Sequence, residues 1–382
     1  MRLLFLVCVA ALFAIGLMMV FNTSSAAVID RALTKSTHQA FLRQIAFALI
    51  GIFFAFFVYK MGYDSLLKFS PYLLICSCFL LVLVFVPPFG MARNGAHRWF
   101  GVGGFSFQPS ELVKYLVPLT FIEWALTRTA PVTFFSFCRF LTFLGVPMAL
   151  IMIEPDNGTV AVIGAALVPL FFLTRISMKF WVIPMVLLAV VGGSVAYQLP
   201  YVRARIAVYL HPESDIKGKG HQAHQAKIAA GSGKLWGRGA GSSLQKLTYL
   251  PEAQNDYIAA IFAEEFGFVG MLLLITLYML LAYAGFSMAL AVKETSGCLV
   301  AATVTFLIAL QAFLNLGVVS GLLPSKGVNL PFFSQGGTSL VANIIGAAIL
   351  LNIGKDAEKK QEKNHSERRW NGRAPLPRPR GR

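Results

Sequence analysis

Long apolar stretches recur from one end of this sequence to the other, and they constrain the fold more than any other feature. An apolar run of about 20 residues can cross the hydrocarbon of a bilayer as a helix, which pairs its own backbone polar groups there. Apolar residues make up 57% of the 382 residues and charged residues only 13%, a balance that excludes an ordinary soluble domain. The sequence therefore predicts an all-α, polytopic membrane protein with about ten transmembrane helices. The expected spans are residues 3–21, 45–60, 71–89, 111–127, 134–153, 158–174, 180–199, 267–292, 298–320 and 340–354.

An even number of spans places both ends of the chain on one side of the membrane. We expect a membrane domain over 1–354 and a basic tail over 355–382. The tail has ten Lys and Arg against four acidic residues, and we expect it to be disordered and to contact anionic lipids. Basic residues favour the cytoplasmic side of a membrane, so both termini are predicted to be cytoplasmic. The short connections on that side carry further positive charge, at Lys60, Lys68, Arg128, Arg139, Arg175, Lys179 and Lys293.

The longest predicted connection, residues 201–256, lies on the opposite side and is strongly basic. Positive charge on this outer face suits a diphosphate headgroup, because Arg binds phosphate in a bidentate manner and Lys as a point charge. A solvated loop that touches lipid headgroups non-specifically explains the charge equally well. The glycine-rich part, 229–243, lacks the spacing of a nucleotide-binding loop. Its glycines therefore indicate tight turns and close backbone approach, and neither a nucleotide nor a nucleic acid is expected as a ligand.

Three acidic residues lie where this loop meets the next apolar run, with Asp256 at the boundary and Glu264 and Glu265 deeper. Asp256 is suited to cap a helix that begins near Tyr257. It is equally suited to act as a general base, since partial burial raises the pKa of a carboxylate towards working pH. The residues alone leave both roles open.

Glu111 and Lys114 stand three residues apart at the start of the fourth apolar run, on one face of the expected helix. This spacing allows an ion pair, and an ion pair inside a membrane marks a functional interior. Capping by Ser110, with an acid suited to the helix N-terminus, is the alternative. Asp156, between two apolar runs, has the same ambiguity because a tight turn also explains it.

The last outer loop, 322–340, mixes Pro, Gly and Lys326 with large apolar residues. Non-helical backbone at membrane depth must be satisfied by protein or water, so the loop either lines a cleft or makes a turn. The five cysteines lie in or beside apolar runs and indicate small buried residues. The pair His221 and His224 lacks a third metal ligand nearby, and no metal site is predicted.

Four segments together resemble the SEDS family of shape, elongation, division and sporulation proteins, which includes FtsW, RodA and SpoVE. They are HRWFGVGGFSFQPSELVK, EPDNGT, the run from GSGKLWGRGAGSSLQKLTYLPEAQND through IFAEEFG, and LLPSKGVNLPFFSQGGTSL. Their order and spacing across residues 90–350 cover most of the membrane domain. The PSKG turn resembles the division type, FtsW, more than the elongation type, RodA.

The resemblance implies a peptidoglycan glycosyltransferase that polymerises lipid II, with inversion, at the outer face of the bacterial cytoplasmic membrane. The implied partners are a class B penicillin-binding transpeptidase and other divisome or elongasome membrane proteins. The family's essential loop acid falls on Asp256, the expected general base. The substrate-binding residues that the resemblance implies are Arg98, Glu111, Lys114, Asp156, Lys246, Glu252 and Lys326. Arg98 and Lys246 are candidates for stabilising the leaving diphosphate, and a divalent cation, Mg²⁺ or Mn²⁺, could share that role.

The chain departs from the family pattern near these residues. Gln254 and Asn255 stand where a His and a Thr are common, and Glu154 stands where a Gln is common. In the other departures, this chain has His97 where the family commonly has Arg, Asn157 where it has Leu and Gln335 where it has Tyr. Two other functions use the same residues. One is a lipid II flippase or other transporter, and the second is a non-catalytic scaffold for a transpeptidase, in which Asp256 is only a helix cap.

Overall fold

A computed structural model of the chain describes residues 1–31, 38–87, 89–93, 96–102, 105–198, 203, 221–246, 255–324 and 327–371. The helices in this part of the chain are α1 (Arg2–Arg31), α2 (Gln39–Met61), α3 (Tyr63–Leu83), α4 (Ser110–Thr127), α5 (Phe134–Ile153), α6 (Asn157–Leu173), α7 (Met178–Gln198), α9 (His221–Ser232), α10 (Ile258–Ala291), α11 (Thr295–Val319) and α12 (Gly337–Asn371).

Each of the ten predicted apolar runs overlaps one of these helices, and the predicted all-α membrane fold is confirmed as a class. Seven helices are long and apolar enough to cross a membrane by length and composition, namely α1, α2, α3, α5, α10, α11 and α12. Two further apolar helices, Asn157–Leu173 and Met178–Leu187, are shorter. The remaining run, 111–127, lies on α4, which contains the charged residues Glu111, Lys114 and Glu123.

A small antiparallel sheet is the main addition to the predicted fold. The strands β1 (Gly90–Arg93), β2 (Ala96–Val102) and β3 (Phe105–Phe107) lie in the outer connection between α3 and α4, in the order β1-β2-β3. The all-α prediction misses the sheet because the strands are short and glycines interrupt their alternation. The rings of Phe89 and Phe100 stack beside it, with centroids 5.6 Å apart.

Several boundaries differ from the predicted spans. α3 covers 63–83 rather than 71–89, and it ends before Pro87 because the residue preceding a proline disfavours helix. α9 lies inside the predicted loop 201–256. α12 continues to Asn371, so residues 355–371 are helical where the sequence predicts disorder; this part is rich in Lys, Glu and Arg, which favour helix. Residues 372–382 lie outside the described part.

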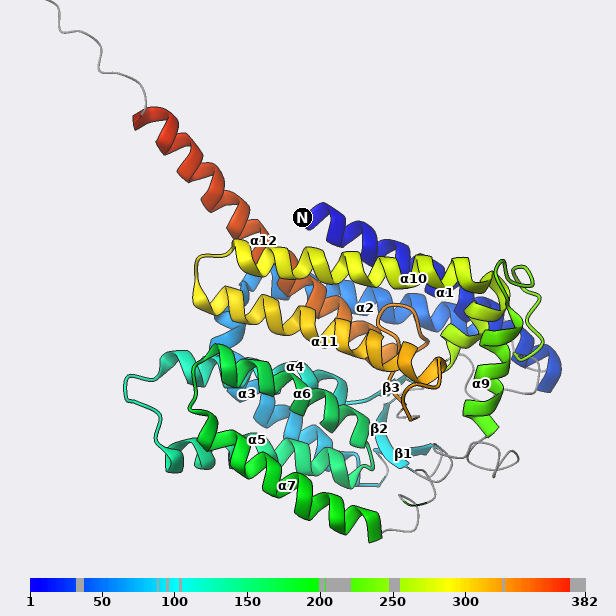
Figure 1. The fold of residues 1–382 in the computed structure, drawn as a ribbon, viewed down its shortest axis with the longest axis horizontal. Helices are drawn as coiled ribbons and strands as arrows, with labels where there is room; N and C mark the ends of the chain where they lie inside the picture. The colour runs from blue at the N-terminus through cyan, green and yellow to red at the C-terminus, as the bar shows by residue number, and fades with distance from the viewer. Residues whose placement is uncertain are drawn as a thin grey trace, which may run out of the picture.

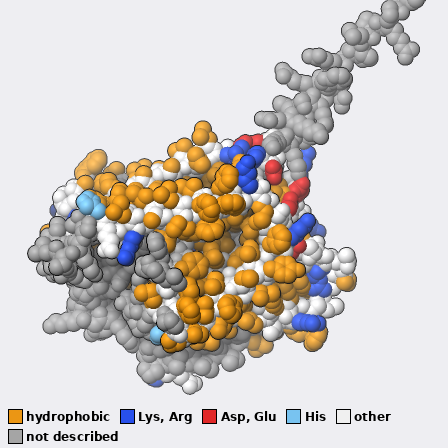
Figure 2. Space-filling model, turned by 180° about the vertical axis from the view of Figure 1, so that it is seen from behind, with side chains coloured by type: hydrophobic (Ala, Val, Ile, Leu, Met, Phe, Trp, Pro, Cys, Tyr) orange, Lys and Arg blue, Asp and Glu red, His pale blue; other side chains and the backbone are white. Residues whose placement is uncertain are grey.

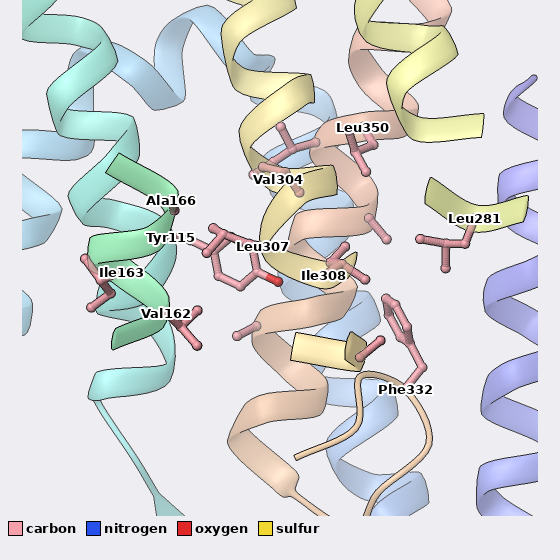
Figure 3. Packing of buried hydrophobic residues seen from close by; sticks show 14 of the residues in the cluster. Tyr115, Val162, Ile163, Ala166, Leu281, Val304, Leu307, Ile308, Phe332 and Leu350 are labelled. Atoms are coloured by element: carbon pink, nitrogen blue, oxygen red, sulfur yellow. The ribbon is translucent and has the colours of Figure 1, made fainter. Parts of the chain in front are cut away.

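The helices form two groups that meet along α11 (Figure 1). One group holds α1, α2, α10, α11 and α12, in which α12 packs on α2 and α10 packs on both α1 and α11. The second group holds α3 to α7. α11 contacts α4 and α6, and this contact joins the groups. Figure 3 shows Tyr115 of the second group beside Leu307 of α11. More than half of the α11 and α12 spans is buried, so these two helices are central.

The two ends of the bundle differ in what they carry (Figure 1). The sheet end holds β1–β3, α9 and the segment between α11 and α12. The tail end holds the α4–α5 connection and the extension of α12. Most Lys and Arg side chains visible in Figure 2 gather at the tail end, on a surface that is otherwise largely apolar. This distribution agrees with the positive charge predicted for the cytoplasmic side.

Candidate functional site

Asp256 lies at the sheet end, in the turn that leads into α10, and it is partly exposed. The N-cap position of α10 is assigned to Tyr257 and the helix begins at Ile258, so Asp256 lies one residue before the N-cap. The side-chain amide of Asn315 on α11 donates hydrogen bonds to the backbone oxygens of Asp256 (2.9 Å) and Val328 (2.8 Å). The turn that carries Asp256 is therefore tied to the segment between α11 and α12 through backbone contacts.

The segment 327–336 is a non-helical stretch that enters the bundle beside Asp256. A β-carbon placed on Gly327, which has φ +65°, would lie 3.5 Å from a carboxylate oxygen of Asp256. Deeper in the segment, Phe333 is fully buried. The hydroxyl of Tyr278 donates to the oxygen of Pro331 at 2.6 Å, and Gln44 donates to the segment as well. Protein groups thus satisfy this backbone, and the outer part of the segment lines the surroundings of Asp256.

Arg98 on β2 holds the turn between α5 and α6. Its Nε donates to the oxygen of Glu154 at 2.9 Å, and its guanidinium also donates to the oxygen of Pro155. A second guanidinium nitrogen lies 4.0 Å from a carboxylate oxygen of Asp156. The side chain is 23% exposed, so part of the guanidinium remains accessible at the sheet end.

Asp156 is the N-cap of α6, as the tight-turn explanation expects. It accepts hydrogen bonds from the backbone N–H (3.3 Å) and the hydroxyl (2.8 Å) of Thr159. It also accepts from the side chain of Gln108 at 3.1 Å, and the backbone N–H of Gln108 donates to the hydroxyl of Thr338 on α12. The segment 327–338 therefore has Asp256 at one end and the Gln108–Asp156 contacts at the other.

Glu154 is the least satisfied acid of this region. It is fully buried, and neither carboxyl oxygen has a hydrogen-bond partner among the described residues. Burial and the neighbouring Asp156 raise the pKa of Glu154 to about 8, against a smaller lowering effect of Arg98. Glu154 is thus mostly protonated at neutral pH, which fits a position where the family commonly has an uncharged Gln.

Glu111 and Lys114 form the predicted ion pair, with Lys114 Nζ 2.5 Å from a carboxylate oxygen of Glu111. Both residues are buried, and Lys114 also donates to the side-chain oxygen of Gln311 on α11 at 2.7 Å. The cap alternative is wrong, because Ser110 is the first helical residue and α4 begins without a side-chain cap. The pair links α4 to α11 inside the bundle, and its substrate-binding role stays a prediction.

Lys246 is fully engaged within the protein. Its ammonium group donates to Glu265 (2.9 Å), to the side chain of Asn22 (2.7 Å) and to the backbone oxygen of Gly241 (2.6 Å). The side chain is 6% exposed. An ammonium group has three donors, and three acceptors take them here. The geometry therefore favours a structural role for Lys246 over the expected contact with phosphate.

Glu264 and Glu265 hold the glycine-rich loop against α10. Glu264 accepts from the hydroxyl of Ser243 (2.5 Å) and lies 3.6 Å from Arg238, while Glu265 also accepts from Asn22 (2.6 Å). We call the loop 233–246 and these two acids the loop clamp. Both acids are buried and paired, so they are structural groups.

Close backbone approach explains the glycines of the loop clamp, as the sequence predicts. α10 is kinked at Gly267, whose φ of 65° and ψ of −162° are not helical. At the kink, the backbone N–H of Phe268 donates to the backbone oxygen of Lys234, and the backbone N–H of Gly239 donates to the backbone oxygen of Glu265. A β-carbon on Gly237 would lie 2.1 Å from the oxygen of Glu265, closer than any side chain allows.

Two expected substrate-binding residues, Glu252 and Lys326, lie outside the described residues, as does Gln254. Among the residues that the structure describes, no group of three or more His, Cys, Asp or Glu side chains could hold a metal ion. The divalent cation stays a prediction. Asn315 and Gln311 are contacts that sequence reasoning missed. Both are amides inside a long apolar run, which is the signal that could have identified them.

A sequence model of the family described as "Cell cycle protein", which joins FtsW, RodA and SpoVE, matches residues 2–359. The chain belongs to this family. The resemblance found from the four sequence segments is thereby confirmed.

Curated relatives match over nearly the whole chain. Stage V sporulation protein E of Bacillus subtilis (strain 168) is 38% identical over 361 residues, which cover 92% of this chain and 96% of that protein. A probable peptidoglycan glycosyltransferase FtsW of Legionella pneumophila is 36% identical over 354 residues, covering 90% of this chain and 88% of that protein.

Solved structures of the family share the fold. A chain from a structure reported as "Structural coordination of polymerization and crosslinking by a peptidoglycan synthase complex" has a TM-score of 0.74 and 26% identity, and the match covers 92% of this chain and 97% of that one. The rod shape determining protein RodA of Thermus thermophilus has a TM-score of 0.65 and 25% identity, with 92% and 96% covered.

Proposed function

We propose that this protein is a peptidoglycan glycosyltransferase, which polymerises lipid II at the outer face of the bacterial cytoplasmic membrane. Its family membership and its relatives named as probable peptidoglycan glycosyltransferases support the reaction class. The observation that carries the assignment of the base is the position of Asp256. This acid is partly exposed, lies one residue before the N-cap of α10, and has a carboxylate oxygen beside Gly327 of the segment between α11 and α12.

The proposed reaction is an inverting glycosyl transfer. Asp256 accepts the proton of the 4-hydroxyl group of the acceptor sugar, and the oxygen attacks the anomeric carbon of the donor. A new glycosidic bond forms as the bond to the polyprenyl diphosphate breaks, and the diphosphate leaves with the electron pair. No nucleotide is needed, because the lipid diphosphate is the activated leaving group.

Arg98 is the described cation best suited to the developing negative charge. Its guanidinium is partly exposed at the sheet end, and contacts to the turn 154–156 fix its position. A donor that is fixed before the reaction stabilises charge without reorganising. In this proposal Lys246 supports the loop clamp and does not contact phosphate, because its three donors are already used.

The proposed partner is a class B penicillin-binding transpeptidase, together with other membrane proteins of division or elongation. The similarity to a chain of a peptidoglycan synthase complex supports a partner of this kind. Both termini are proposed to be cytoplasmic, which puts Asp256 and the sheet end outside. The gathering of Lys and Arg at the tail end supports this orientation.

The deciding experiment is lipid II polymerisation by the purified protein, with and without a transpeptidase partner whose crosslinking activity is blocked. Asp256→Asn is expected to lower the rate by about 10²-fold or more, the range seen when a general base is removed. The variant should fold, because Asn315 binds the backbone oxygen of residue 256 and not its carboxylate. Asp356→Asn, at the tail end, is the matched control and should keep the wild-type rate.

Each rival function has its own outcome. Wild-type rates with Asp256→Asn would remove the base assignment. Movement of lipid II across the bilayer without any polymer would favour a transporter. Growth of cells that depend on the Asp256→Asn variant would favour a scaffold.

A further inference from the structure

A cavity at the tail end lies at the opposite end of the bundle from the residues of the proposed reaction (Figure 1). It opens between the last turn of α4 and the first turns of α5 and has a volume of about 340 Å³. We call it the α4–α5 pocket. Its lining residues are Trp124, Arg128, Ser136, Arg139, Phe140 and Phe143.

One wall of the α4–α5 pocket is an ordered stack of aromatic and guanidinium planes. The rings of Trp124 and Phe140 are parallel within 2°, with centroids 4.2 Å apart. The guanidinium of Arg128 lies 4.5 Å from the centre of the Trp124 ring and donates to the hydroxyl of Ser136 at 2.9 Å. Stacking on an aromatic face and a hydrogen bond fix Arg128 before any ligand arrives.

The second arginine of the pocket has no such engagement. Arg139 is exposed on α5 and makes no hydrogen bond or ion pair with any described residue. Neither Asp nor Glu is among the residues that line the cavity. Two guanidinium groups and a hydroxyl therefore meet in one cavity without a carboxylate from the lining to balance them, and an anion is the chemical complement.

The position of the pocket narrows the identity of that anion. The α4–α5 connection lies at the end of the bundle where other Lys and Arg side chains gather (Figures 1 and 2). On the same face of α5, one turn further into the bundle than Phe143, Val146 is 51% exposed. A ligand with a phosphate at the pocket and an acyl chain along this apolar face matches both surfaces. Basic pockets between transmembrane helices bind anionic phospholipid headgroups in this way.

We propose that the α4–α5 pocket binds the phosphate of an anionic phospholipid. The fixed guanidinium of Arg128 binds the phosphate, and the guanidinium of Arg139 on α5 contacts the same phosphate. Guanidinium groups make bidentate contacts with the phosphate of either lipid. Selectivity against a zwitterionic headgroup comes from its own ammonium group, which would face the same two arginines.

The test uses the full-length purified protein in detergent and measures bound lipid by native mass spectrometry. Phosphatidylglycerol and phosphatidylcholine with the same acyl chains are compared. The wild type is expected to hold one phosphatidylglycerol at least about tenfold more tightly than phosphatidylcholine, since one charged hydrogen-bonded contact corresponds to about this factor. Arg139→Gln is expected to remove most of this difference.

Two further variants separate the pocket from general basicity and from folding. Arg175→Gln changes an exposed arginine on the turn after α6 and should leave phosphatidylglycerol binding within about twofold of wild type. Arg128→Gln should weaken binding and also lower the melting temperature, because Arg128 packs on Trp124. Arg139 makes no cation–π contact with a ring of the described residues, so Arg139→Gln tests binding alone.

Three outcomes would overturn the proposal. The first is equal binding of the two lipids by the wild type. The second is an Arg139→Gln variant that binds phosphatidylglycerol as the Arg175→Gln control does. The third is inorganic phosphate at the same concentration protecting the protein from thermal unfolding as well as phosphatidylglycerol does, which would make the ligand a free anion and not a lipid.

Discussion

The loop clamp and the region around Arg98 both bring buried acids together with basic residues, yet they are built differently. In the loop clamp, Glu264 and Glu265 each accept several hydrogen bonds, and Lys246 has acceptors for all its donors. Around Arg98, the carboxyl group of Glu154 has no hydrogen-bond partner among the described residues, and Arg98 is partly exposed.

The difference indicates which polar groups are structural and which are available for chemistry. A buried charge network that is fully satisfied fixes a conformation and has no donors left for a ligand. An unsatisfied acid and an exposed cation in a membrane protein are retained only if something other than stability requires them. The loop clamp therefore holds the glycine-rich loop against α10, while the Arg98 region belongs to the proposed site.

Breaking the loop clamp should have the largest effect on stability. Glu265→Gln leaves the buried ammonium group of Lys246 without its carboxylate, and the expected loss is about 3–5 kcal/mol of unfolding free energy. A clear drop in the apparent melting temperature in detergent would report it. The control is Glu358→Gln, which breaks the exposed pair with Arg2 and should cost less than about 1 kcal/mol. Equal melting temperatures for the two variants would contradict a structural clamp.

The pair inside the bundle can be tested by removing one charge and then both. Lys114→Met should cost about 3 kcal/mol, because it leaves the carboxylate of Glu111 buried and unpaired. The double variant Glu111→Gln with Lys114→Met should recover most of the melting temperature, since no buried charge remains. Lipid II polymerisation by the recovered double variant then separates the roles. Near wild-type activity would assign the pair to helix packing, and strongly reduced activity would support the predicted role in substrate binding.

Close backbone approach in the loop clamp predicts that Ala substitutions at two of its glycines lower the free energy of unfolding by different amounts. Gly237→Ala should cost about 2–4 kcal/mol, because its β-carbon meets the oxygen of Glu265 and the residue has φ +82°. Gly241→Ala has φ +78° but no atom within 4 Å of the added carbon, so only the backbone strain of about 1–2 kcal/mol remains. The difference between their melting temperatures isolates the steric contact, and a larger loss for Gly241→Ala would refute it.

The unsatisfied acid of the Arg98 region predicts an effect on stability that depends on pH. The pKa of Glu154 is raised to about 8, so between pH 4.5 and 8 the unfolded chain releases a proton that the folded protein keeps. Stability from this group therefore falls as pH rises through that window. Glu154→Gln does not titrate and should melt at the wild-type temperature near pH 5 and at a higher temperature near pH 8.5. A pH-independent difference between variant and wild type would show that Glu154 is ionised in the folded protein.

Much of the fold follows from the sequence because it depends on local properties. Apolar runs of membrane length form helices wherever they occur, and the ten predicted runs overlap helices for that reason. The sheet at 90–107 and the extension of α12 were not predicted. The sheet was missed because strands are stabilised by pairing with one another, which a pattern within one strand does not show. The extension of α12 was missed because the apolar pattern used to identify spans does not detect a polar helix.

In the candidate site, too, local sequence patterns predicted some features and tertiary contacts decided others. The sequence by itself determined the family and the pairing of Glu111 with Lys114, since these rest on motifs and on spacing within one helix. The catalytic role of Asp256 stays a prediction from the same motifs. Only the tertiary structure decided that Lys246 is occupied, because one of its partners, Asn22, is 224 residues away. It likewise decided that Asn315 ties the Asp256 turn to Val328. A side chain's availability for a ligand depends on which groups packing brings within about 3 Å of it, and the chain order does not encode that distance in any local pattern.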